Sequence, residues 1–188
     1  MVRWPGKIAA GTISNTIMSH LDWVPTFMSV VGNGAIKDEL KEGKRVGDRT
    51  FRVHLDGYDF LPYLTGKTDA GPRREFFYFS DDGLLTGTRV GDWKLVYAEQ
   101  RSKRFDVWRD PFVQLRIPKV FNLRRDPFER ADTDSNSYNV WWDKKIGWAG
   151  MLGSAAVMQF VESLHQFPPR QRPASFSVDQ IMETIQEK

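Results

Sequence analysis

The chain has 188 residues, of which 40% are hydrophobic and 13% aromatic, a composition that is typical of a packed globular protein and excludes a disordered one. Its formal net charge is only +3, and Lys and Arg are interspersed with Asp and Glu, so no basic block predicts a nucleic-acid-binding face. Because there is no cysteine, disulfide bonds, thiolate metal sites and thiol nucleophiles are excluded together.

The chain opens on MVRW, which predicts the end of a buried strand rather than a charged leader. A helix is predicted over residues 21–31, because Pro25 is tolerated in a first helical turn and Gly32 ends the apolar pattern. The polar, glycine-rich stretch 33–57 predicts a surface loop, and the apolar cluster at 58–64 predicts a single helical turn.

Three strand-like runs follow, REFFYFS, LLTGTRV and WKLVYAE, at residues 74–80, 84–90 and 93–99. Asp-Gly and Gly-Asp pairs separate them, and such pairs between strands mark tight hairpin turns. We therefore expect an antiparallel meander, which a fourth strand at residues 119–123 would extend.

Residues 137–164 predict a long helix, because apolar side chains recur at steps of three and four. Gly147, Gly150 and Gly153 weaken it by about 1 kcal/mol each relative to Ala, and would either admit a closely packed neighbour or break the helix. Its uncharged run, residues 146–161, is shorter than the roughly 20 residues of a membrane span, which predicts a helix buried in protein.

The end of the chain predicts one more element. FPPRQRP ends the long helix, and SFSVDQIMETIQEK, residues 175–188, predicts a short amphipathic helix with Ser177 as its N-cap. The chain thus divides into residues 1–70, which cannot form a core alone, and residues 71–188, which hold a small sheet and a long helix.

Candidate catalytic residues are few. His20 lies two residues before Asp22. This pair predicts either the start of a metal or acid–base site, or a helix cap made by Ser19 or Asp22. We favour the cap, because side chains two residues apart lie on different faces of a helix. His54 lies in a stretch without clustered ligands, and His165 ends the long helix, where the helix dipole favours it. The adjacent carboxylates Asp81 and Asp82 are explained by a hairpin turn, and the two Arg-Asp-Pro-Phe copies, 109–112 and 125–128, by turns.

Five stretches resemble, in order, the C-terminal portion of bacterial arylsulfatases of the alkaline-phosphatase-like superfamily. They are MVRWPGKIAAGTISNTIMSHLDWVPTFMSVVG, GYDFLPYLTGK, EFFYFSDDGLLTGTRVGDWKLVYAEQ, VFNLRRDPFERADTDSN and FPPRQRPASFSVDQIMETIQE. Together they cover almost the whole chain. The resemblance implies that Met1 is an internal methionine, or a start codon within a longer reading frame.

The resemblance also implies a fold and a reaction. The fold would be α/β: residues 1–70 would end an alkaline-phosphatase-like core, and residues 71–188 would form a subdomain with a roughly four-stranded antiparallel sheet packed on a long helix. The reaction would be hydrolysis of sulfate esters by a formylglycine nucleophile, made from Cys or Ser in C-x-P-x-R, with a divalent metal ion, usually calcium.

The parts of that site are expected upstream of residue 1. Residues 70–74 and 166–170 fit the x-x-P-x-R skeleton, but neither Ala70 nor Gln166 can become formylglycine. No residue of this chain is therefore assigned a catalytic, cofactor-binding or metal-binding role, and calcium would belong to the full-length enzyme and not to this chain. We expect the 188-residue chain alone to be inactive on sulfate esters.

Other functions compete with this one. The chain could be a non-catalytic binding or assembly module that self-associates through an exposed apolar edge, or part of a phosphatase or phosphotransferase of the same superfamily, which the W-P-G and D-W-K-L stretches disfavour. Family habit predicts a periplasmic or secreted protein, although no signal peptide is visible. The expected partner is a sulfate-ester small molecule, with no nucleic acid and no membrane span.

Overall fold

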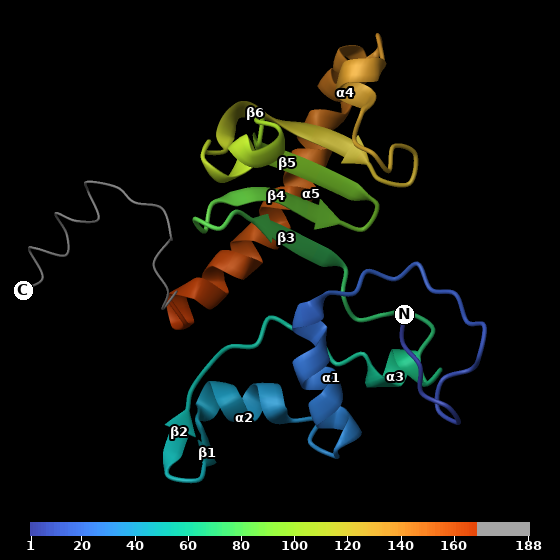
Figure 1. Ribbon diagram of the computed structural model, residues 1–188, viewed down its shortest axis with the longest axis vertical. Helices are drawn as coiled ribbons and strands as arrows, with labels where there is room; N and C mark the ends of the chain where they lie inside the picture. Colours follow the sequence, from blue (N-terminus) through green and yellow to red (C-terminus); the bar gives the residue numbers. More distant parts are fainter. Residues whose placement is uncertain (169–188) are drawn as a thin grey trace, which may run out of the picture. The chain divides into compact units, whose positions relative to one another are not determined.

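The computed structural model describes residues 1–168 and divides the chain into two compact units. One unit holds residues 1–76 and 159–167, and the other holds residues 77–158 and 168 of the described part. The division falls inside a strand and inside a helix, β3 and α5 (Figure 1). The predicted domains, residues 1–70 and 71–188, stay a prediction, and the expected helix at 175–188 with Ser177 as its N-cap lies outside the described residues.

The first unit contains short helices and a two-stranded hairpin, joined by long irregular segments. Its elements are the 3₁₀ turn η1 (His20–Asp22), the helices α1 (Trp23–Val30), α2 (Ile36–Glu42) and α3 (Leu61–Leu64), and the hairpin strands β1 (Lys44–Val46) and β2 (Arg49–Phe51). The predicted helix over 21–31 is confirmed: it begins with the 3₁₀ turn η1 and continues as α1. It ends just before Gly32, whose φ of 89° cannot continue a helix. The predicted turn at 58–64 is confirmed as α3.

Two expectations for this unit are wrong. Residues 1–4 form no strand, because no described segment pairs with them, and Met1 and Val2 are exposed. The stretch 33–57 is not one loop but holds α2 and the β1–β2 hairpin. The mixed charge of this stretch suits helix α2, because carboxylates in its first turn and a lysine in its last turn interact favourably with the helix dipole. The buried side chain of Ile36 packs the helix against the rest of the unit.

The second unit is built on a four-stranded antiparallel sheet in the order β3-β4-β5-β6. The strands are β3 (Glu75–Phe79), β4 (Leu85–Val90), β5 (Trp93–Glu99) and β6 (Val113–Asn122), with η2 (Arg104–Trp108) between the last two. The meander is confirmed. The fourth strand begins at Val113, earlier than expected. Because β6 is an edge strand, it can include Pro118, which cannot donate a ladder hydrogen bond. The pairing register with β5 shifts next to this proline, between Val96 and Ala98.

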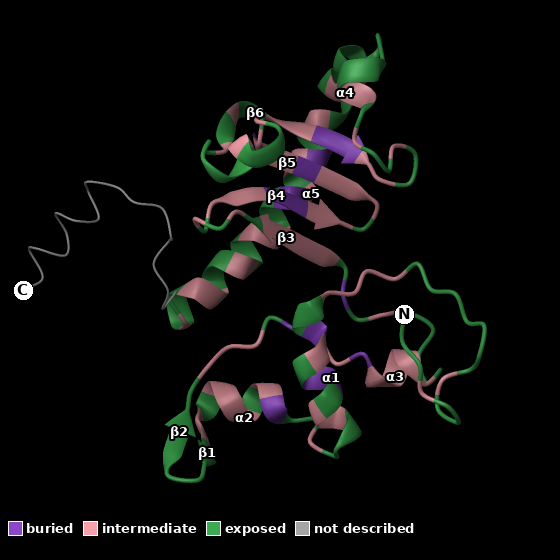
Figure 2. Ribbon diagram, in the orientation of Figure 1, coloured by how far each residue is buried: buried purple, intermediate pink, exposed green. Residues whose placement is uncertain are grey.

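The helices of this unit are α4 (Ala131–Asp134) and the greater part of α5 (Tyr138–Gln166), which is unbroken despite its glycines. The core joins Leu95, Val120 and Ala149, and Figure 2 shows that the buried residues of the sheet gather on its inner strands and on β6. At Gly153 the helix packs close to the sheet, because a Cβ atom there would lie 3.0 Å from Leu95 Cδ2. At Gly147 and Gly150 a Cβ atom would lie in open space.

Tryptophan dominates this core. Trp93 stacks on Trp141 at 5.9 Å between ring centroids and meets Trp148 edge to face at 5.1 Å. The indole of Trp142 donates a hydrogen bond to the Pro118 carbonyl at 2.9 Å. Tyr138 both donates to the Val120 carbonyl and accepts from its N–H, so the edge strand β6 is held by the helix through side chains.

Candidate functional site

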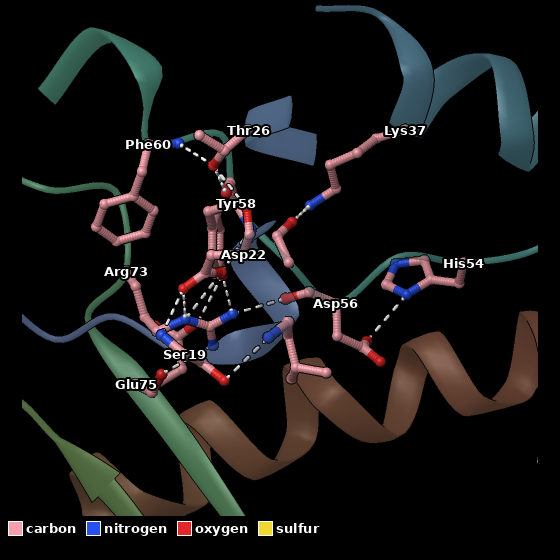
Figure 3. Close-up of polar contacts among 12 residues, drawn as sticks. Ser19, Asp22, Thr26, Lys37, His54, Asp56, Tyr58, Phe60, Arg73 and Glu75 are labelled. Carbon is pink, nitrogen blue, oxygen red and sulfur yellow. Dashed lines mark hydrogen bonds and ion pairs between the residues drawn. The ribbon is translucent and has the colours of Figure 1, made fainter. Parts of the chain in front are cut away.

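A carboxylate with no solvent exposure lies at the end of η1. Ser19 is the N-cap of η1, and its hydroxyl accepts from the Leu21 N–H at 3.3 Å while the Asp22 carboxylate accepts from the Ser19 N–H at 2.8 Å. The second carboxylate oxygen accepts from the Tyr58 N–H at 2.7 Å. Asp22 therefore joins the start of the helix to a segment far along the chain (Figure 3).

Arg73 supplies the charge that neutralises Asp22. Its Nε donates to Oδ2 at 2.9 Å and its Nη2 donates to Oδ1 at 2.6 Å, and the two side chains are only 4% and 0% exposed. The guanidinium group also donates to the carbonyls of Asp56, at 2.9 Å, and Glu75, at 3.2 Å. Both charges are thus compensated and hydrogen-bonded, so neither group is free to react.

Tyr58 covers this ion pair. Its ring centroid lies 4.8 Å from the guanidinium carbon of Arg73 and 4.8 Å from Nζ of Lys37, and its hydroxyl donates to Glu75 at 2.6 Å. Burial and then the Glu75 hydrogen bond raise the pKa of Tyr58 to about 12, so the phenol remains a donor at neutral pH. Burial and then the charge of Lys41 lower the pKa of Lys37.

Thr26 and Gly57 complete the packing. The buried Thr26 hydroxyl donates to the Asp22 carbonyl at 2.6 Å and accepts from the Phe60 N–H at 2.9 Å. At Gly57 a Cβ atom would lie 2.0 Å from the Leu21 carbonyl oxygen, which no side chain allows. The polar centre, which we define as Ser19, Asp22, Tyr58 and Arg73, is therefore a closed junction between chain segments and not an open site.

The structure separates the residues that the sequence placed together. His20 is exposed whereas Asp22 is buried, so the two do not form a site, and the capping interpretation is confirmed for Ser19. His54 has a partner that the sequence analysis missed: its Nδ1 lies 3.0 Å from Oδ1 of Asp56. His165 is exposed in the last turn of α5.

The other candidates are structural as well. Asp81 and Asp82 lie in the turn between β3 and β4, where Gly83 takes a φ of 76°, as a hairpin turn requires. Asp126, in the second Arg-Asp-Pro-Phe copy, accepts from the N–H groups that begin α4. Arg73 lies inside the 70–74 match to x-x-P-x-R, and no sequence signal distinguishes it from its neighbour Arg74.

The described residues do not fit a divalent cation. Among residues 1–168, no group of three or more His, Asp or Glu side chains lies close enough together to hold a metal ion. Asp22, the one fully buried carboxylate in this part of the chain, is already paired with Arg73. The same part of the chain contains no helix that is long and apolar enough to cross a membrane.

A cavity of about 450 Å³ lies on the second unit, over the sheet face that carries Lys94 and Lys119. Lys94 contacts both carboxylate oxygens of Glu129 at 2.7 and 2.8 Å. Lys119 contacts Glu99 and Asp132; burial lowers the pKa of this lysine, but the two carboxylates outweigh burial and raise it overall. Both lysines are therefore neutralised by carboxylates that line the same cavity.

Comparison with known proteins gives a consistent class. The chain is 32% identical to an arylsulfatase of Hemicentrotus pulcherrimus over 149 residues, 27% identical to arylsulfatase G of Homo sapiens over 140, and 26% identical to the N-acetylgalactosamine-6-sulfatase of Canis lupus familiaris over 153. The matches cover 69%, 70% and 68% of this chain but only 24% of each relative. The chain thus spans about a quarter of the length of the curated relatives it matches. No family model matches it.

The fold agrees. The crystal structure of PsFucS1 sulfatase from Pseudoalteromonas sp. superposes with a TM-score of 0.66 over 90% of this chain and 30% of that protein, at 17% identity, a likeness that shows the fold alone. The chain is a sulfatase homologue. Among these relatives two are arylsulfatases, and all three are animal proteins, so a bacterial origin stays a prediction.

Proposed function

We propose that this chain is the C-terminal portion of an arylsulfatase, a sulfuric-ester hydrolase whose nucleophile and divalent metal ion belong to residues that precede Met1. The polar centre supports this proposal most strongly. It joins SHLDW to GYDF, two stretches that resemble arylsulfatases, through the Tyr58 N–H and the Asp22 carboxylate, and Asp22 is neutralised by Arg73. The identity to arylsulfatases over a quarter of their length points the same way.

In this proposal the chain ends the core fold and supplies a packing subdomain. No residue of the chain is given a catalytic, cofactor-binding or metal-binding role, because it has no cysteine and the only fully buried carboxylate among residues 1–168 is paired with Arg73. Formylglycine and calcium would belong to the full-length enzyme, which would act on a sulfate-ester small molecule. Export to the periplasm or the medium is part of the same proposal.

Hydrolysis assays test this function. The purified 188-residue chain and the product of any longer reading frame would be supplied with calcium and 4-nitrophenyl sulfate. We expect turnover only from the longer protein, and metal-dependent turnover by the 188-residue chain would contradict the proposed division of labour. Preferential turnover of 4-nitrophenyl phosphate by the longer protein would instead establish the phosphatase alternative.

The apolar face of residues 21–31, which comprise the end of η1, α1 and its C-cap, supports a second candidate, a non-catalytic assembly module. Leu21, Val24, Phe27 and Val31 are between 51% and 74% exposed. They recur at steps of three and four, so they share one helix face. Sedimentation velocity over a range of concentrations tests it. This function predicts dimers that a Phe27→Glu variant loses, whereas a monomer at every concentration would refute it.

A further inference from the structure

The connection between α1 and α2, residues 31–35, contains an Asn-Gly pair. Among the asparagines of the chain, only Asn33 is followed by glycine. In such a pair the backbone nitrogen of the glycine can attack the side-chain carbonyl of the asparagine, because glycine has no Cβ atom to hinder the approach. Asparagine is one of the thermolabile residues of proteins. The pair is therefore a candidate modification site, and because its reaction is intramolecular, it needs neither a ligand nor a free surface.

Asn33 links the two helices through its backbone and through its side chain. Its N–H donates to the Met28 carbonyl at 2.8 Å, and the Gly32 N–H donates to the Ser29 carbonyl at 3.1 Å. These are the two hydrogen bonds of a Schellman motif, which ends α1. The side-chain amide of Asn33 donates to Glu39 of α2 at 3.0 Å. A chemical change at Asn33 would therefore act on the contact between α1 and α2.

The nitrogen atom that would attack is not engaged elsewhere. Within the described part of the chain, the N–H of Gly34 donates no hydrogen bond. The turn between β3 and β4 offers a contrast, because the N–H of Gly83, in an Asp-Gly pair, donates to the Ser80 carbonyl at 3.0 Å. Of these two pairs, only the one in the α1–α2 connection combines an asparagine with a free glycine N–H.

Glu39 restrains the group that would be attacked. Its carboxylate accepts from Lys44 and from the Asn33 amide, and these two hydrogen bonds, that of Lys44 first, lower the pKa of Glu39. Glu39 is therefore a charged acceptor at neutral pH. Because the Asn33 amide nitrogen leaves the protein during the reaction, its hydrogen bond to Glu39 is lost on the way to the product. This hydrogen bond should therefore slow the reaction.

We propose that Asn33 and Gly34 form a site of spontaneous deamidation, which the hydrogen bond to Glu39 restrains. The Gly34 nitrogen bonds to Cγ of Asn33, and the bond from Cγ to Nδ2 breaks. The amide group leaves as ammonia, with the proton that the Gly34 nitrogen has lost. Water then opens the resulting succinimide ring at either carbonyl, which gives aspartate or isoaspartate. Water is the co-reactant, and nothing is oxidised or reduced.

Either product should loosen α2 from α1. Aspartate places a second carboxylate where the Asn33 amide now donates to Glu39, so repulsion replaces a hydrogen bond of 3.0 Å. Isoaspartate also adds a methylene group to the main chain, between the Schellman motif of α1 and the first turn of α2. The modification is therefore a slow conformational change built into this connection.

Peptide mapping by mass spectrometry tests the proposal on the 188-residue chain after incubation at neutral and at alkaline pH. Aspartate and isoaspartate should accumulate at Asn33 ahead of Asn136, which is exposed but is followed by serine. Alkaline pH should accelerate the reaction, because the attacking nitrogen loses a proton. Glu39→Ala should raise the rate about threefold or more, as expected when one hydrogen bond is lost. Lys44→Gln leaves that hydrogen bond in place and should change the rate less than about twofold.

Hydrogen exchange measures the structural consequence. In the converted chain, the backbone amides of α2 should exchange about fivefold faster or more. Asn33→Gln keeps an amide donor but would have to close a larger ring, so its α2 should stay protected after the same incubation. Circular dichroism verifies that each variant is folded. If Glu39→Ala does not fold, Glu39→Gln keeps a weaker, uncharged acceptor and should show a smaller acceleration.

Three results would overturn the proposal. They are an Asn33 amide that persists or is lost no faster than that of Asn136, equal rates in the natural chain and in a folded Glu39 variant, and unchanged exchange of α2 after conversion. None of these measurements involves a sulfate ester or turnover. Their failure would therefore leave the proposed function standing, and failure of the hydrolysis assay would leave the deamidation site intact.

Discussion

The guanidinium group of Arg73 donates hydrogen bonds from two of its nitrogen atoms to the carboxylate of Asp22. The two residues are 51 positions apart in the sequence, and both side chains are almost fully buried. Both groups also form hydrogen bonds with backbone groups of neighbouring segments. Its role is to fasten the start of α1 to the segment that leads into β3.

The first prediction is that Arg73→Met destabilises the chain by about 3–5 kcal/mol, because it leaves the Asp22 carboxylate buried and unpaired. Urea unfolding measures the loss. Arg74→Gln, an exposed neighbour, should change stability by less than about 0.5 kcal/mol. A loss below about 1 kcal/mol for Arg73→Met would show that the ion pair is not what joins these segments.

The second prediction concerns alkaline pH. Because the pKa of Tyr58 is raised to about 12, its folded form holds the proton more tightly than the unfolded form does. This contribution to stability is fully present below the ordinary tyrosine value, and it is lost as pH rises through about 12. Unfolding free energies should thus fall more steeply with alkaline pH for the natural chain than for Tyr58→Phe. Parallel curves would contradict the assignment.

The third prediction contrasts two buried threonines. The hydroxyl of Thr88 is fully buried and has no hydrogen-bond partner among the described residues, whereas that of Thr26 has two at close range. Thr88→Val should therefore stabilise the chain by about 1 kcal/mol, and Thr26→Val should destabilise it by about 1–3 kcal/mol. Thermal unfolding of both variants decides the matter, and the same sign for both would be the contrary result.

The fourth prediction concerns the glycines of α5. Gly147→Ala and Gly150→Ala place a methyl group in open space and should each stabilise the helix by up to about 1 kcal/mol. Gly153→Val should destabilise it by about 1–3 kcal/mol, because its side chain meets Leu95 and Tyr97. Chemical denaturation of the three variants tests this, and a stabilised Gly153→Val chain would mean that the helix does not pack on β5 as described.

The sheet was predictable because its signals are local. Asp-Gly and Gly-Asp turns between alternating strands specify a meander without long-range information, and β3, β4 and β5 lie where these signals place them. The helix α5 follows in the same way from its apolar spacing. In contrast, the early start of β6 depends on its edge position, which the sequence does not state.

The polar centre was not predictable from sequence for a physical reason. Ser19 and Asp22 form a capping box that local spacing does indicate. Arg73, however, is one of two adjacent arginines, and its contact with Asp22 joins residues 51 apart in the sequence, which local spacing does not indicate. Helix α2 was missed because its alternating charges suit a solvated loop as well as a short helix.

Sequencing the DNA upstream of the Met1 codon tests most directly whether the chemistry lies outside these residues. We predict that the open reading frame continues and encodes a C-x-P-x-R or S-x-P-x-R stretch together with paired aspartates. An in-frame stop codon and a ribosome-binding site immediately before Met1 would contradict this, and the chain would then be a gene product without a sulfatase active site.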